Sequence, residues 1–349
     1  MQDRFIPHAK LLLKTSFRRT MKERSPRQLE ALWKETDMIS GELVGAMVMI
    51  MRTNGCAWAK KGGCSMCGYR SASVRGVTEE DLMGQVDQAV SQYGGEKFVK
   101  IYTSGSFLDD NEVPPAVRTR IFREFSGAER ILFESRPEFV GDEVLSSLPR
   151  TVTIALGLES SNDDVLEKSI NKGFTSEDSR IAAVRIRNAG LKVRTYLILK
   201  PPYLKESAAI NDAVASVMFA DDFSDEISIN PLNVQRNTLA ERLWKRGEYR
   251  PPWIWSLVEV LRSCAGKTRS RLMSSPSGGG TQRGVHNCGE CDKRILDGVE
   301  RFSFTQNVKD LDEQCKCINS WKRYMETETM LGSAADAERA LDDDLIIRS

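Results

Sequence analysis

The chain has 349 residues, of which 40% are hydrophobic and 28% are charged, and its formal net charge is +1. This composition is ordinary for a soluble protein, and no apolar run is long enough to span a bilayer. The first twenty residues lack a small-residue cleavage site, so we expect a cytoplasmic protein with no membrane contact.

The charge is unevenly distributed at the start of the chain. Residues 10–35 carry many more Lys and Arg than Glu. We expect residues 1–40 to form a basic helical arm, and such an arm suits a phosphate backbone. The same charges would also suit the solvated face of a helix.

The middle of the chain alternates strand-like runs with helical patterns such as residues 82–93 and 179–190. Alternation at this spacing predicts parallel strands joined by right-handed crossovers. We therefore predict an α/β fold in which residues 41–250 form a partial (β/α)6 barrel. Its reactive groups should lie at the carboxyl ends of the strands. The predicted strands are residues 45–52, 97–105, 130–136, 151–160, 192–201 and 225–233.

Three cysteines follow the first of these strands: Cys56, Cys64 and Cys67, with the spacing C-x7-C-x2-C. Three thiolates on one loop can hold three irons of a 4Fe-4S cluster and leave the fourth iron open to S-adenosylmethionine. Zinc is the alternative, but it normally needs four ligands, and the only histidines are His8 and His286.

These cysteines and the strand ends behind them resemble the radical S-adenosylmethionine (radical SAM) superfamily. Its usual motif is C-x3-C-x2-C with an aromatic residue before the last cysteine, whereas this chain has seven residues in the first gap and Met66 in that place. Longer first gaps occur in the elongator-type branch. We expect the stretch Ala57–Gly63 to shape the rim of the pocket. The resemblance implies a 4Fe-4S cluster, S-adenosylmethionine and an electron donor.

The resemblance also assigns cofactor-binding residues. The turn Ser104-Gly105-Ser106 lies where the family binds the methionine amino group, and Glu159 lies where relatives contact ribose. Lys172 occupies the place of an Arg that pairs with the methionine carboxylate, so a point charge would replace a planar fork. The remaining candidates are Tyr69 at the end of the cysteine motif, Glu134 and Arg136 in a run similar to ETRPD, and Tyr196 in place of a ribose-binding acid.

Some of these residues have simpler interpretations. Glu134 and Arg136 could form a structural ion pair, and Lys172 could be a surface lysine at a helix end.

A second cysteine group lies beyond Pro251 and Pro252, in the predicted extension of residues 251–325. Two close pairs of cysteines match a structural zinc site, although a second iron–sulfur cluster could use the same ligands. An acidic tail, residues 326–349, follows. The cysteines are Cys288, Cys291, Cys315 and Cys317.

The order of the motifs, ending in HNCGECD, is most similar to the family of radical subunits of archaeosine synthase. That family acts on tRNA, cleaving the carbon–nitrogen bond of a lysine attached to 7-cyano-7-deazaguanine. The resemblance implies a lysine-transferring, transglycosylase-like partner subunit. We expect Asn230, Asn233 and Arg236 to face the substrate from the last strand, although the asparagines could instead cap the strand end. Another elongator-type tRNA-modifying enzyme, or a zinc-dependent tRNA- or protein-binding module, is the alternative.

Overall fold

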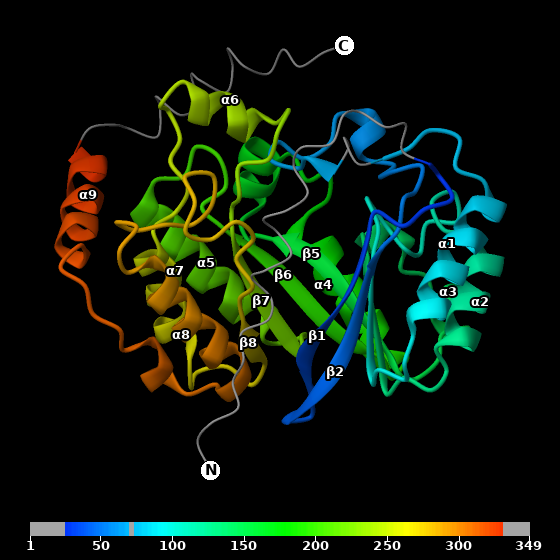
Figure 1. The fold of residues 1–349 in the computed structure, drawn as a ribbon. Helices are drawn as coiled ribbons and strands as arrows, with labels where there is room; N and C mark the ends of the chain where they lie inside the picture. Colours follow the sequence, from blue (N-terminus) through cyan, green and yellow to red (C-terminus); the bar gives the residue numbers. More distant parts are fainter. Residues whose placement is uncertain (1–24, 70–72, 331–349) are drawn as a thin grey trace.

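The computed structural model describes residues 25–69 and 73–330 (Figure 1). Within these residues one sheet of eight strands follows the order of the chain. β1 and β2 form an antiparallel hairpin, and β2 to β8 run parallel. The strands are β1 (Ala31–Ile39), β2 (Glu42–Ile50), β3 (Phe98–Tyr102), β4 (Arg130–Ser135), β5 (Val152–Glu159), β6 (Lys192–Leu199), β7 (Glu226–Pro231) and β8 (Arg271–Met273).

The sheet curls into a half-barrel with helices on its outer side (Figure 1). The α-helices are α1 (Glu79–Gln92), α2 (Pro115–Glu124), α3 (Asp142–Ser146), α4 (Ser176–Asn188), α5 (Glu206–Ala220), α6 (Leu239–Lys245), α7 (Ile254–Cys264), α8 (Asp292–Thr305) and α9 (Ile318–Met330). Shorter turns are η1 (Ala59–Lys61), η3 (Pro137–Phe139), the π-helix η4 (Val165–Ile170) and η5 (Val308–Leu311). The predicted fold class is confirmed, with two strands more than the six expected.

Residues 31–39, expected to belong to a helical arm, form strand β1 instead. Ser40 and Gly41 both have positive φ, as a tight two-residue hairpin turn of type I′ requires, and this turn folds β1 back along β2. The Lys100 ammonium of β3 pairs with Glu35 at 2.6 Å and also with Asp37. Hairpin geometry and cross-strand charges therefore outweigh the helical tendency of this segment. Residues 1–24 of the predicted arm lie outside the described residues.

The predicted boundary at residue 250 does not coincide with the edge of the barrel. β8 pairs in parallel with β7, and α7 packs against α5. The segment 251–325 therefore continues the barrel before it supplies the second cysteine group. Of the predicted acidic tail, only residues 326–330 are described, as the end of α9.

The outer face of the sheet packs against the helices and is almost entirely apolar, as parallel strands covered by helices require. α1 and α4 each begin with a capping box, in which a Thr and an Asp three residues later exchange hydrogen bonds with the backbone. This side of the sheet holds most of the core. Its buried strand residues include Met47, Val99, Ile131, Ile154, Val193 and Ile227.

The inner face of the half-barrel has a charged layer below an apolar one. Side chains alternate between faces along each strand, so Phe98, Leu132 and Ala155 form an apolar inner layer. Nearer the amino ends of the strands, the buried Glu226 accepts two hydrogen bonds from Arg130, at 2.8 and 2.6 Å, and one from Arg194 at 2.8 Å. These groups form a charged floor at the amino ends of the strands.

No helix among the described residues combines the length and the apolar character that a bilayer crossing demands.

Candidate cofactor site and metal centre

The first cysteine group lies on the loop that leaves β2 at the carboxyl end of the sheet. Cys56, Cys64 and Cys67 are half-buried and form no disulfide. Burial raises the pKa of Cys64 and raises that of Cys67 to about 11. A bound cation would offset this cost, because metal ligation requires thiolates.

The turn after β3 cradles this loop. A Cβ on Gly105 would stand 2.5 Å from Cys56 Cα and 2.4 Å from a carboxylate oxygen of Glu112. Only a residue without a side chain allows this approach. The structure therefore brings together the two motifs that the sequence placed at the ends of neighbouring strands.

Glu112 is a supporting residue that the sequence did not reveal. It is buried, and its carboxylate accepts hydrogen bonds from Thr53 Oγ1 and from the backbone N–H of Ser106, both at 2.6 Å. The Ser106 hydroxyl in turn accepts from the backbone N–H of Arg136 at 3.1 Å. Ser106 is thus buried within the turn and supports it, while Ser104 remains half-buried at the surface of the site.

Lys172 is a buried residue and not a surface lysine, because only 7% of it is exposed. Its ammonium donates to Glu159 at 2.8 Å, and a Cβ on Gly157 would meet both groups. Glu159 ends β5 with a φ of 72°, a left-handed conformation that is uncommon outside glycine. This backbone turns the Glu159 carboxylate toward the inner side of the site. Lys172 also lowers the pKa of Cys64 against the larger effect of burial, so the pair lies near the cysteine loop.

The expected alternative for Arg136, an ion pair with Glu134, is not what the structure shows. Arg136 pairs with Glu138 at 2.5 Å, donates to the backbone carbonyl of Lys172 at 3.1 Å and lies over the ring of Phe174 at 4.9 Å. Glu134 belongs to β4, whereas Arg136 lies one residue past the end of this strand, directly before η3. Arg136 therefore joins β4 to the segment that carries Lys172.

Glu134 lies on the inner face of the half-barrel, above the apolar layer. Among the described residues no hydrogen bond reaches its carboxylate. Burial, and then the charge of Glu159, raise the pKa of Glu134 to about 7. A carboxyl group near its midpoint at neutral pH can bind a cation or exchange a proton.

Two tyrosines adjoin Glu134. Tyr196 lies within electrostatic range of Tyr102 and Glu134, and burial raises the pKa of Tyr196 well above its ordinary value. Tyr69 is 52% exposed at the mouth, and its hydroxyl contacts Gln235 and lies within electrostatic range of Glu134. Tyr69 thus comes from the cysteine loop and Tyr196 from β6.

The three predicted substrate residues occupy different environments. Asn230 is half-buried on β7 and accepts from Ser228 at 3.3 Å, whereas Arg236 is exposed. Asn233 lies against Gly278, where an added Cβ would stand 3.3 Å from its amide nitrogen. The structure thus places Asn230 on the inner face and Asn233 against the loop before α8.

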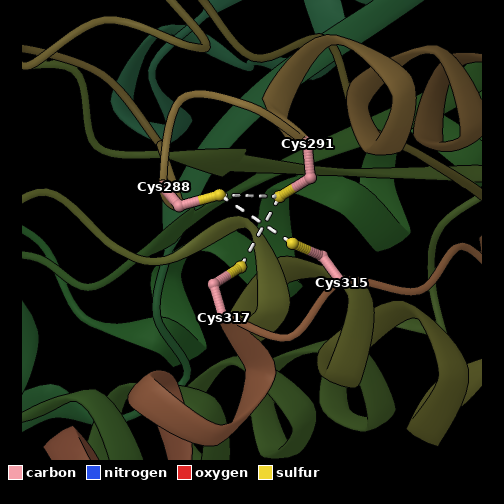
Figure 2. Close-up of side chains that lie close together, drawn as sticks. All are labelled: Cys288, Cys291, Cys315 and Cys317. Carbon is pink, nitrogen blue, oxygen red and sulfur yellow. Dashed lines mark hydrogen bonds between the residues drawn. The ribbon is translucent and has the colours of Figure 1, made fainter.

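The second cysteine group converges on one point (Figure 2). The sulfurs of Cys288 and Cys291 are 3.6 Å apart, as are those of Cys291 and Cys317, and all four lie within 4.8 Å of one another. A tetrahedral zinc with bonds of about 2.3 Å places its sulfurs about 3.8 Å apart. A cluster distributes its ligands over several irons and holds them further apart. The spacing of the sulfurs therefore favours a single ion.

Neighbouring N–H groups point at these sulfurs, as they do around bound thiolates. Trp255 Nε1 donates to Cys317 Sγ at 3.2 Å, and Asn287 Nδ2 to Cys291 Sγ at 3.7 Å. Burial alone would raise the pKa of Cys288, but hydrogen bonds from the backbone N–H groups of Cys291 and Glu290 lower it below its ordinary value. This set of ligands fits a metal ion. Among the described residues, Cys56, Cys64 and Cys67 do not converge in this way, as ligands of different irons need not.

Comparison with known proteins shows which families this chain resembles. The sequence model of the Radical SAM superfamily matches residues 50–211. The chain is 41% identical over 315 residues to the archaeosine synthase subunit beta of Methanosarcina acetivorans, covering 85% of this chain and 90% of that protein. It is 38% identical to the protein of the same name from Thermococcus kodakarensis, covering 84% and 96%.

A solved structure, the archaeal Methanocaldococcus infernus Elp3 with an N-terminal deletion, is 17% identical with a TM-score of 0.44. The match covers 68% of this chain and 57% of that one.

Proposed function

Because the chain belongs to the radical SAM superfamily and, within it, to the family of archaeosine synthase subunit beta, we propose that it completes archaeosine in tRNA. In the proposed reaction it cleaves the carbon–nitrogen bond of a lysine attached to 7-cyano-7-deazaguanine and leaves the amidine on the base. The observation that carries the proposal is the cysteine loop seated against Gly105 at the open end of the half-barrel.

Radical SAM enzymes use a 4Fe-4S cluster and S-adenosylmethionine, and Cys56, Cys64 and Cys67 would hold the cluster. When bound, these groups supply an organic radical that removes one hydrogen atom from the substrate. The Gly105 cradle and the half-buried, disulfide-free thiols fit such a cluster. The protein's own contribution is to orient the ligands and exclude water.

Two sets of polar groups would bind S-adenosylmethionine. Backbone carbonyls and the Ser104 hydroxyl at the turn after β3 would accept from its amino group. Lys172 would attract its carboxylate, and Glu159 would hold both Lys172 and the ribose. Arg136 and Ser106 act on the site through the backbone, by fixing the position of these groups. Tyr69 and Tyr196 would contact the adenosine end.

The substrate would enter from the mouth of the half-barrel. Glu134 and Asn230 on the inner face would bind the amino and polar groups of the lysine. Asn233 would support the neighbouring loop, and Arg236 would meet a phosphate outside the mouth. At the opposite end the apolar layer and the charged floor would separate the substrate from the amino ends of the strands.

Exposed basic residues at the mouth support contact with tRNA. Lys60 and Lys61 on η1 are exposed, as are Arg236 and Arg242 at the start of α6. Two hydrogen bonds hold these regions together: Gly68 N–H donates to Gln235 at 2.5 Å and Leu239 N–H to the Ser65 carbonyl at 2.9 Å. Lysines and arginines on such a rim would contact phosphates.

We propose the remaining partners from the family. The name subunit beta implies a second archaeosine synthase subunit, and we expect it to be the lysine-transferring, transglycosylase-like enzyme. An electron donor must also reduce the cluster. We propose zinc for the site of Cys288, Cys291, Cys315 and Cys317, on the spacing of their sulfurs.

The decisive experiment is anaerobic incubation of the purified chain with lysine-modified tRNA, a reductant and S-adenosylmethionine, followed by nucleoside analysis. We expect archaeosine and 5′-deoxyadenosine from the wild type and neither product from Cys64→Ala. Cys264→Ala, on the buried face of α7, is the matched control and should retain activity. Metal analysis adds an independent result, because zinc in both cysteine groups without iron would instead favour a zinc-dependent binding module.

A further inference from the structure

The cysteine motif contains an unusually long gap, and one residue outside the motif contacts the loop near both of its ends. Asn171 follows the π-helix η4 and has a φ of 55°. Its backbone carbonyl accepts a hydrogen bond from Trp58 Nε1 at 2.8 Å. Its side-chain amide donates to the backbone carbonyl of Gly63 at 2.8 Å. Trp58 comes two residues after Cys56, and Gly63 comes directly before Cys64.

The residues before Asn171 extend this contact. Ser65 N–H donates to the Ile170 carbonyl at 2.8 Å, and Ser65 Oγ donates to the Ser169 carbonyl at 2.6 Å. The end of η4 thus binds the loop at positions on both sides of Cys64.

Two further contacts hold Trp58 in this position. A Cβ on Gly173 would stand 2.5 Å from the indole ring, so the ring packs directly on the glycine backbone. Arg136 lies over the same ring at 5.5 Å. The inserted stretch is therefore docked on the segment 171–173 and does not extend freely into solvent.

We propose that Asn171 is a positioning residue for the cluster-binding loop, an inference that rests on the proposed function. A longer loop loses more conformational entropy when its ends are fixed. Asn171 contacts both Trp58 and Gly63, near the two ends of the inserted stretch. These contacts restrict the conformations of the loop, so that Cys56 and Cys64 are held in position to bind the cluster. The next residue is Lys172, which faces Glu159. The same turn therefore connects the cysteine loop to the proposed carboxylate site of S-adenosylmethionine.

Three variants test this inference. Asn171→Asp keeps the shape and the left-handed backbone but places a carboxylate against the Gly63 carbonyl. Asn171→Gly keeps the backbone and removes the amide. Trp58→Phe keeps an aromatic side chain but removes the N–H donor and the part of the indole ring that lies on Gly173. Asn188→Asp, an exposed change at the end of α4, is the control for the altered charge.

Each full-length variant is reconstituted anaerobically, and the rate of iron release to a chelator is measured. We expect release about fivefold faster for the three test variants, the ratio that the loss of one ordinary hydrogen bond gives. We also expect the electron paramagnetic resonance spectrum of the reduced cluster to respond heterogeneously to S-adenosylmethionine. Asn188→Asp should match the wild type in both measurements.

The outcomes separate the inference from the proposed function. Wild-type iron release and wild-type spectra in all three variants would overturn the role of Asn171 and leave the proposed function intact. A wild-type chain that takes up no iron would overturn both. Retained zinc and an unchanged melting temperature show that a variant is folded. If an Asn171 variant does not fold, Trp58→Phe tests the inference in its place.

Discussion

Gly105 lies against the backbone of Cys56, so closely that a methyl group on Gly105 would stand 2.5 Å from Cys56 Cα. Gly105→Ala must therefore displace the cysteine loop, the turn after β3 or both. We expect iron content after reconstitution to fall roughly tenfold, because relieving an overpacked contact costs about 1–3 kcal/mol and here displaces a ligand. The measurement is iron and sulfide per chain.

Gly141→Ala is the matched control for this prediction, since a Cβ at Gly141 would meet no atom within 4 Å. It should bind iron like the wild type. Normal iron content in Gly105→Ala would show that the contact does not position the cluster.

The four-cysteine site is expected to stabilise the fold. Cys288→Ser or Cys317→Ser should release the bound ion and lower the melting temperature by roughly 5 °C or more, because a structural metal contributes folding free energy. Zinc per chain and thermal unfolding, monitored by circular dichroism, measure the two effects. Cys264→Ala, which removes a buried thiol elsewhere, should keep its zinc. Iron with acid-labile sulfide at this site would contradict the assignment.

Those parts of the site that are formed by short sequence motifs at strand ends could be predicted from the sequence. Cys56 and the turn at Gly105 each follow a recognisable strand and Glu159 ends one, and parallel strands bring their carboxyl ends to one edge. Close cysteine pairs likewise predict the second metal site.

Other features depend on contacts that no local pattern records. β1 is rich in charged residues and is held by its hairpin and by Lys100, while β8, with three residues, is too short to show a period. Glu112 and Asn171 each act through hydrogen bonds to residues far away in the sequence, Thr53 for the first and Trp58 and Gly63 for the second. The only sequence signal for Glu112 is its place in an acidic run shortly after Ser106, from which neither its burial nor its partner Thr53 can be inferred.

Glu226 is expected to stabilise the floor of the half-barrel. Burial alone would raise the pKa of Glu226, but the charges and hydrogen bonds of Arg194 and Arg130 hold this pKa far below its usual range. Glu226→Gln removes the anion and leaves two buried guanidinium groups, which should cost about 3–5 kcal/mol of unfolding free energy at neutral pH. Denaturant unfolding measures this loss.

The pH dependence of this effect has a definite sign. A carboxyl group with a lowered pKa in the folded state stabilises the protein above its unfolded pKa, near 4.5, and this contribution is lost as the pH falls. The difference between wild type and Glu226→Gln should therefore shrink below about pH 4.5. Glu248→Gln, an exposed change on the same side of the barrel as α6, should have no effect at any pH. A constant difference across the pH range would argue against an ionised Glu226.

Glu134 should show the opposite sign, because burial and then Glu159 raise its pKa to about 7 in the folded protein. The folded state prefers the protonated form, so ionisation destabilises it progressively between about pH 4.5 and pH 7. Glu134→Gln, which stays neutral, should melt roughly 2–5 °C higher than the wild type at pH 8 and at the same temperature near pH 4.5. Glu143→Gln, exposed on α3, is the control. Equal melting temperatures at pH 8 would mean that Glu134 ionises without cost. Its carboxylate would then be solvated at the mouth, and it would not be available as a proton-exchanging group beside the substrate.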